Sequence, residues 1–145
     1  MIEMKDEELR QAMAVLESYN AQLESITRQV KLLQISLEET NRARESLLAL
    51  KEAKEGDEIL LPVGASSFVT AKVAAEKKVI VGVGSRVSVE KSLDDAVTFM
   101  AKNGDDIAGA LNKAVNALNE VEGMTSQLTE AIQNEYRNRQ ATDQQ

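Results

Sequence analysis

The chain has 145 residues, of which only 3% are aromatic, and it contains neither histidine nor cysteine. The absence of both residue types excludes Ser-His-Asp and Cys-His catalytic groups, disulfides, and zinc sites built on imidazole or thiolate. The formal net charge of −7 would repel a phosphate backbone, so we do not expect a nucleic-acid partner.

Neither a membrane span nor a secretion signal is expected from the apolar residues. No apolar run approaches the roughly 18 residues that a membrane-spanning helix needs. The first eight residues are acidic and lack the apolar stretch of a secretory signal. We therefore expect a soluble, cytoplasmic protein that does not contact a membrane.

Glycine and proline divide the chain into three parts. Neither occurs in residues 1–55, whereas four glycines and the one proline fall within residues 56–84. Because these residues interrupt regular structure, the sequence predicts a long helix over 1–56, a β-rich segment over 57–91 and a second long helix over 92–145. We expect these three parts to form a single domain (1–145).

The first part keeps a seven-residue repeat of apolar side chains, which is typical of a coiled-coil helix. Gly56 is expected just after the helix end, where glycine is common. The residues of the repeat are Leu9, Ala12, Leu16, Tyr19, Leu23, Ile26, Val30, Leu33, Leu37, Thr40 and Leu47.

The middle part changes to short valine-rich runs broken at glycines, and this pattern predicts two β-hairpins in succession. Four short strands cannot bury both of their faces alone, so we expect their apolar side chains to pack against other subunits. The residues predicted to serve subunit assembly are Ile59, Leu61, Val63, Phe68, Val69, Val79, Val81, Val83, Val87 and Val89.

The last part carries a second repeat of the same kind. Ser92 is expected to cap the helix start, and Asn103-Gly104-Asp105 is expected to loosen or kink the helix. The polar tail from Arg137 to Gln145 is expected to fray. The residues of the repeat are Ile107, Leu111, Ala114, Leu118, Val121, Thr125, Leu128 and Ile132.

The predicted fold is mainly α: a long antiparallel two-helix coiled coil with two central β-hairpins. A compact insert between two pairing helices forces them to run antiparallel, which brings both chain termini to the same far tip. A two-helix seam buries its stripe incompletely, so apolar surface should stay accessible at this tip. Its residues are Met1, Ile2, Met4, Leu9 and Met13 on one side and Leu128, Ile132 and Tyr136 on the other.

The middle of the chain resembles the α-class subunits of the prefoldin family. Residues 60–69 read LLPVGASSFV, and residues 79–91 read VIVGVGSRVSVEK. In that family, a strand with a Val-Pro-(Leu/Val)-Gly end precedes a second valine-rich hairpin that closes on Glu-Lys. Here the order shifts slightly, because Val81-Gly82-Val83-Gly84 spans the second turn.

The resemblance implies a subunit of a hexamer with two α-type and four β-type (prefoldin beta) subunits, whose hairpins join into an oligomeric β-barrel. It implies an ATP-independent chaperone that captures non-native polypeptide clients and delivers them to a group II chaperonin. The client contacts would lie at the distal coil ends, at the eight tip residues named above.

Two alternatives remain open from the residues. The β-rich middle could instead drive assembly of a structural coiled-coil scaffold or filament that holds no client. The methionines could be core or end-of-helix residues, with Met13 on the flank of the repeat. An enzyme is not expected, since no paired carboxylates, activated nucleophile or metal cluster stands out, and we expect no catalytic residue, metal or cofactor.

Overall fold

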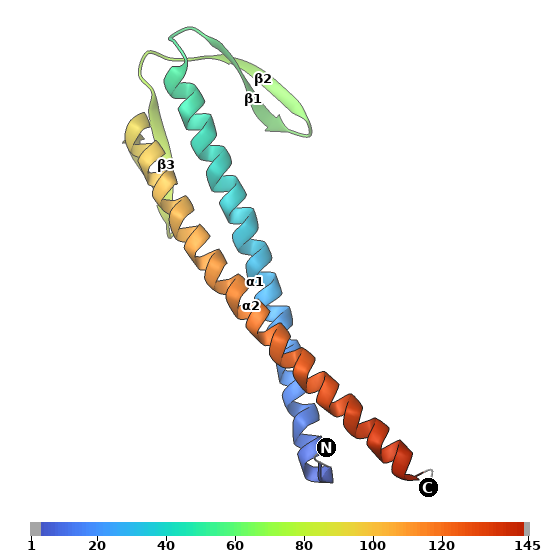
Figure 1. Ribbon diagram of the computed structural model, residues 1–145. Coiled ribbons are helices and arrows are strands. Elements are labelled where there is room, and N and C mark those ends of the chain that lie inside the picture. Colours follow the sequence, from blue (N-terminus) through green and yellow to red (C-terminus); the bar gives the residue numbers. More distant parts are fainter. Residues whose placement is uncertain (1–3, 144–145) are drawn as a thin grey trace. The chain divides into compact units, whose positions relative to one another are not determined.

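The structure, a computed structural model, describes residues 4–143 and confirms two long helices with two antiparallel hairpins between them (Figure 1). The order along the chain is α1 (Asp6–Glu52), β1 (Glu58–Gly64), β2 (Ser67–Lys72), β3 (Lys78–Gly84), β4 (Val87–Ser92) and α2 (Leu93–Asp143).

The chain divides into two compact units. The terminal unit comprises Met1–Gln34 and Gly109–Gln145, and the hairpin unit comprises Ile35–Ala108. Each unit therefore contains a piece of both helices, and the hairpin unit also holds all four strands.

In the terminal unit the two helix pieces run antiparallel. Asp6 of α1 contacts Arg139 of α2, and Met13 of α1 contacts Tyr136 of α2. Residue numbers therefore rise along α1 in the direction in which they fall along α2. Every repeat residue predicted in this unit is buried or half-buried, which is the pattern of a coiled-coil seam. Within it, Leu9, Val30, Ala114, Val121 and Ile132 are the buried apolar residues.

The hairpin unit has the same antiparallel seam, extended by a small core. Leu47 of α1 packs with Leu93 and Ala96 of α2, and Val81 of β3 completes this cluster. Ser92 caps α2 as predicted, because its Oγ accepts a hydrogen bond of 3.2 Å from the Asp95 N–H.

The structure differs from three local predictions, those for Gly104, for the end of α2 and for Gly56. Helix α2 is continuous through Gly104, which is buried in the seam against Thr40 and Asn41 of α1. The polar end of α2 is helical up to Asp143, and the contacts of Arg139 with the start of α1 give this end tertiary support.

The third concerns Gly56, which is not the residue that follows α1. The helix already ends at Glu52, and the Gly56 N–H donates to the carbonyl of Val73 at the base of the first hairpin. Lys77 Nζ instead donates hydrogen bonds to the carbonyl of Lys51, in the last turn of α1, and to that of Ala53, the residue after the helix. Lys77 lies between the hairpins, so it ties their connection to the helix end.

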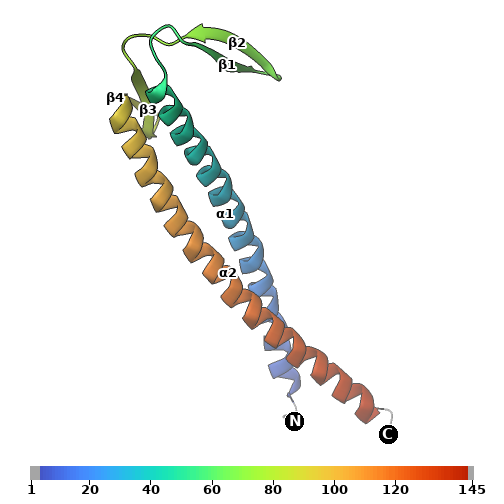
Figure 2. The same ribbon diagram turned by 45° about the horizontal axis from the view of Figure 1, so that its top comes forward.

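The two hairpins repeat one geometry along the chain. Glu58 pairs with Lys72 in the first, and Lys78 pairs with Ser92 in the second, so the same register recurs twenty residues later. Each hairpin has an irregularity just before its turn and two turn residues with positive φ, Ala65-Ser66 and Ser85-Arg86. Figure 2 shows β3 and β4 beside the start of α2.

Replacing Gly104 by alanine is expected to stabilise the fold by about 1 kcal/mol, the helix-propensity difference between the two residues. A Cβ at this position would lie 3.6 Å from Asn41 Oδ1, which is an ordinary contact distance. Thermal unfolding at fixed protein concentration measures the change. Gly123→Ala, where a Cβ would meet nothing within 4 Å, is the control, and a loss of stability at Gly104 alone would show that the seam needs glycine there.

Candidate functional site

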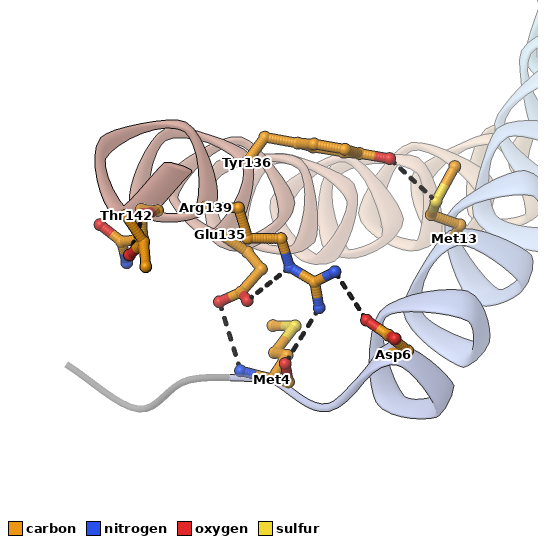
Figure 3. A network of polar contacts seen from close by, with 8 residues as sticks. Met4, Asp6, Met13, Glu135, Tyr136, Arg139 and Thr142 are labelled. Atoms are coloured by element: carbon orange, nitrogen blue, oxygen red, sulfur yellow. Dashed lines mark hydrogen bonds and ion pairs between the residues drawn. The ribbon is translucent and has the colours of Figure 1, made fainter. Parts of the chain in front are cut away.

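Exposed apolar side chains of the terminal unit lie on both flanks of its seam. On one flank the Tyr136 hydroxyl donates to the Met13 sulfur over 3.5 Å, and both residues are exposed (Figure 3). On the other flank Val15 and Met124 are exposed. Methionine is flexible and polarizable, which suits contact with varied apolar partners.

Val15 and Met124 line a shallow groove of about 370 Å³ between the two helices. Its lining is mainly apolar and includes Tyr19, and the other lining residues are Ala12, Gln127, Leu128 and Ala131. An open, largely apolar groove can accept apolar side chains without demanding one shape of ligand.

The structure separates the predicted tip residues into different environments. Met13 and Tyr136 are exposed, Met4 and Leu128 are half-buried, and Leu128 lines the groove. Leu9 and Ile132 are each only 7% exposed, because they lie in the seam. Met1 and Ile2 lie outside the described residues.

A polar network closes the end of the terminal unit (Figure 3). The Arg139 guanidinium donates from Nε to Glu135 Oε1 (3.0 Å), from Nη1 to Asp6 Oδ1 (2.7 Å) and from Nη2 to the Met4 carbonyl (3.1 Å). The Met4 N–H in turn donates to Glu135 Oε2 over 3.2 Å. The start of α1 and the last turns of α2 are thus joined through one arginine and one carboxylate.

The network also shifts the titration of its charged groups. The hydrogen bond from Arg139, and then that from the Met4 N–H, lower the pKa of Glu135, against an opposing effect of burial. Hydrogen bonds to Glu135 and Asp6 raise the pKa of Arg139. Both groups are therefore held in their charged forms.

The second exposed apolar surface lies on the hairpins. Their register places Leu60, Pro62 and Phe68 on one face of the first hairpin, and Ile59, Leu61 and Val69 on the other. Apart from Ile59, which is half-buried, these side chains are exposed. A hairpin with apolar side chains exposed on both faces is typical of a strand pair that another chain covers.

The second hairpin differs, because one of its faces already packs on this chain's own helices. Val81 is 2% exposed and Val79 is half-buried against the same core. On this face too, Lys91 Nζ lies 5.3 Å from the centre of the Phe99 ring. On the opposite face Ile80 is 76% exposed.

Most residues predicted to serve assembly are therefore accessible to a partner, but not all of them. Val81 is already buried within this chain, whereas Ile59 and Val79 are half-buried. The sequence analysis missed Leu60 and Ile80, which are among the most exposed apolar residues of the hairpins. The exposed members of the predicted set are Leu61, Val63, Phe68, Val69, Val83, Val87 and Val89.

Within residues 4–143, no group of three or more acidic side chains is arranged to hold a metal ion. Nor does either helix, over the part of the chain that the structure describes, have a segment both long and apolar enough to cross a bilayer.

A family model for prefoldin subunits matches residues 19–138, which include both hairpins and most of both helices. The chain belongs to the prefoldin family. This family consists of chaperones, and the two-hairpin layout is the one that the sequence resemblance to α-class subunits implied.

Curated proteins similar to this chain include prefoldin alpha subunits of archaea. That of Methanothrix thermoacetophila is 32% identical over 108 residues, which cover 74% of this chain and 71% of the relative. That of Thermofilum pendens is 32% identical over 109 residues (75% and 84%), and that of Pyrococcus horikoshii is 36% identical over 103 residues (70% of each).

Two solved structures share the prefoldin fold. A filamentous PFD from Methanocaldococcus jannaschii aligns with a TM-score of 0.65 at 24% identity, covering 79% of this chain and 95% of that one. The prefoldin beta subunit from Thermococcus strain KS-1 aligns with a TM-score of 0.58 at 18% identity, covering 92% and 96%.

Glu135→Gln is expected to lower the melting temperature at neutral pH and to have less effect in acid. Because the pKa of Glu135 is lower in the folded chain than in the unfolded one, its carboxylate stabilises the fold above the unfolded pKa, and this contribution is lost as the pH falls through the folded pKa.

The measurement is thermal unfolding of both proteins at pH 7 and below about pH 4, the range in which a glutamate titrates. Glu130→Gln, at an exposed position of the same helix, is the control. A melting-temperature difference that stays constant over this range would contradict the assigned role of the carboxylate.

Proposed function

We propose that this chain is the α-type subunit of a hetero-oligomeric prefoldin with two α-type and four β-type subunits. In this proposal it captures non-native polypeptides at the apolar surface of its terminal unit and delivers them to a group II chaperonin without using ATP. The family membership supports a chaperone role. The observation that carries client capture is the exposed apolar surface on both flanks of the terminal seam, formed by Met13, Val15, Met124 and Tyr136.

The hairpins support the assembly part of the proposal. Leu60 and Phe68 on one face of the first hairpin, and Leu61 and Val69 on the other, are exposed to water in the single chain. Covering such surface stabilises an assembly by about 25 cal/mol for each Å² of apolar area removed from water. We propose that β-type hairpins cover these faces and complete an oligomeric β-barrel.

Client binding at one terminal unit need not be strong. Each apolar contact contributes little, but several subunits that present such surfaces together would hold one chain by avidity. This mode of binding also suits clients of unrelated sequence, because the contacts depend on apolar area and not on a particular motif.

Adjacent residues of β3 test the assembly part. Val81→Ala is expected to destabilise the chain by about 1–3 kcal/mol, because it removes buried methyl groups from the core. Ile80→Ala, at the exposed neighbouring position, is expected to leave the stability of the chain unchanged but to weaken association with a β-type subunit.

Thermal unfolding of the chain and native mass measurements of its mixture with a β-type subunit give the two readouts. If the double variant Ile80→Ala with Leu60→Ala assembles with the β-type subunit as well as the unmodified chain does, no partner covers the hairpin faces that carry these two residues.

A four-site variant tests client capture. Replacing Met13, Val15, Met124 and Tyr136 by serine, in the complex with a β-type subunit, is expected to reduce protection of a chemically unfolded test enzyme by at least about fivefold, since the avidity of apolar contacts is lost. Light scattering after dilution of the enzyme measures its aggregation. The matched control replaces exposed apolar residues of α1 that lie in the hairpin unit, Ile35 and Leu48, by serine.

Circular dichroism checks that both variants remain helical. Transfer of labelled client from the unmodified complex to an added group II chaperonin tests delivery. If the four-site variant protects as well as the control, the client surface is misassigned, and if the unmodified complex never protects, the scaffold alternative is favoured.

A further inference from the structure

The apolar seam of the terminal unit ends in two charged residues. Glu135 and Arg139 follow Ile132 at spacings of three and four, which are the spacings of the seam itself. Glu135 is only 4% exposed, so its carboxylate occupies a place where an apolar side chain would continue the stripe. The end of the seam is closed by charge and hydrogen bonding in place of apolar packing.

The contacts made there are suited to holding two chain segments together. Both oxygens of the Glu135 carboxylate and all three guanidinium nitrogens of Arg139 are engaged. Their partners on the other segment are the backbone of Met4 and the side chain of Asp6, at the start of α1. Losing the guanidinium would release all three of its contacts together.

This closure is accessible to water on its outer side. The side chain of Asp6 is 86% exposed and that of Arg139 is 36% exposed. Ion pairs with exposed partners are weak and are screened by salt. The closure is therefore of a kind that thermal motion or a competing charged group can open, unlike a seam closed by leucines.

On each helix, the closure is about one turn away from a buried apolar residue of the seam. Leu9 and Ile132 are the buried apolar residues nearest to this end of the seam within the described part of the chain. Met13 follows Leu9 by one helical turn, and Tyr136 follows Ile132 by one turn, so each buried residue has an exposed neighbour on the same side of its helix. Separating the helix ends would join the four side chains into one apolar surface.

We propose that Met4, Asp6, Glu135 and Arg139 form a latch that closes the seam over Leu9 and Ile132, and that opening this latch enlarges the surface offered to a client. The inference rests on the proposed function and adds a means of regulating the same site. The apolar surface gained on opening would lie along the seam between the two helix ends. An extended apolar segment of a non-native chain fits a surface of this shape.

Arg139→Gln tests the latch, with Arg137→Gln as the matched control at an exposed position two residues away. In the full chain, hydrogen exchange of residues 4–10 is expected to become faster in Arg139→Gln and to stay unchanged in Arg137→Gln. In the complex with a β-type subunit, Arg139→Gln is expected to protect the unfolded test enzyme at a concentration at least about twofold lower, because two more large apolar side chains become accessible.

Salt provides a second comparison. Raising the salt concentration to about 0.5 M, where the screening length falls to a few ångström, should increase exchange in the unmodified chain and have little further effect on Arg139→Gln. Faster exchange without better protection would overturn the latch as a regulator, while leaving the proposed function intact if the unmodified complex protects. Unchanged exchange would overturn the latch itself.

A reversible cross-link keeps the proposal testable if Arg139→Gln loosens the fold too far. The chain has no cysteine, so Asp6→Cys with Arg139→Cys can be joined selectively by a bifunctional methanethiosulfonate reagent. The joined protein is expected to protect the test enzyme less well than the same protein after reduction with dithiothreitol. Equal protection in both states would contradict the latch, whereas absence of protection in the unmodified complex would count against the proposed function.

Discussion

The seam in which apolar side chains of α1 interlock with those of α2 supports every other feature of the chain, because neither helix alone could bury its stripe. Its antiparallel direction follows from the insert that joins the helices. Contacts such as Asp6 with Arg139 in the terminal unit, and Gly104 with Thr40 in the hairpin unit, obey the same direction. This one constraint brings the start of α1 to the end of α2. It also brings the end of α1, both hairpins and the start of α2 together in the hairpin unit.

The hairpins show how a chain can be folded and still be incomplete. The second hairpin is fixed by Val81, which shares a core with Leu47, Leu93 and Ala96. The first hairpin has the same register but leaves Leu61 exposed at the position equivalent to Val81. The apolar surface that one hairpin buries within the chain is thus left accessible on the other, which is the arrangement that a hetero-oligomer would use.

The sequence was sufficient for the elements and their pairing, because a repeat of alternating threes and fours can be read directly from residues such as Leu9, Leu16 and Leu23. It could not assign Val81 to an internal core, since alternation along a strand distinguishes two faces but does not say which face meets a helix. The ends were also misjudged. Arg139 and Lys77 lie in polar stretches, and only their distant partners reveal their roles: Asp6 for Arg139, and the carbonyls of Lys51 and Ala53 for Lys77.

The shared register of the two hairpins has a consequence for how such chains can change length. A hairpin enters and leaves at the same end, so a complete one can be gained or lost without altering where the following helix begins or which way it runs. The step of twenty residues between Glu58 and Lys78 is one such complete module. A chain with one hairpin more or fewer could in this way keep the same helical framework.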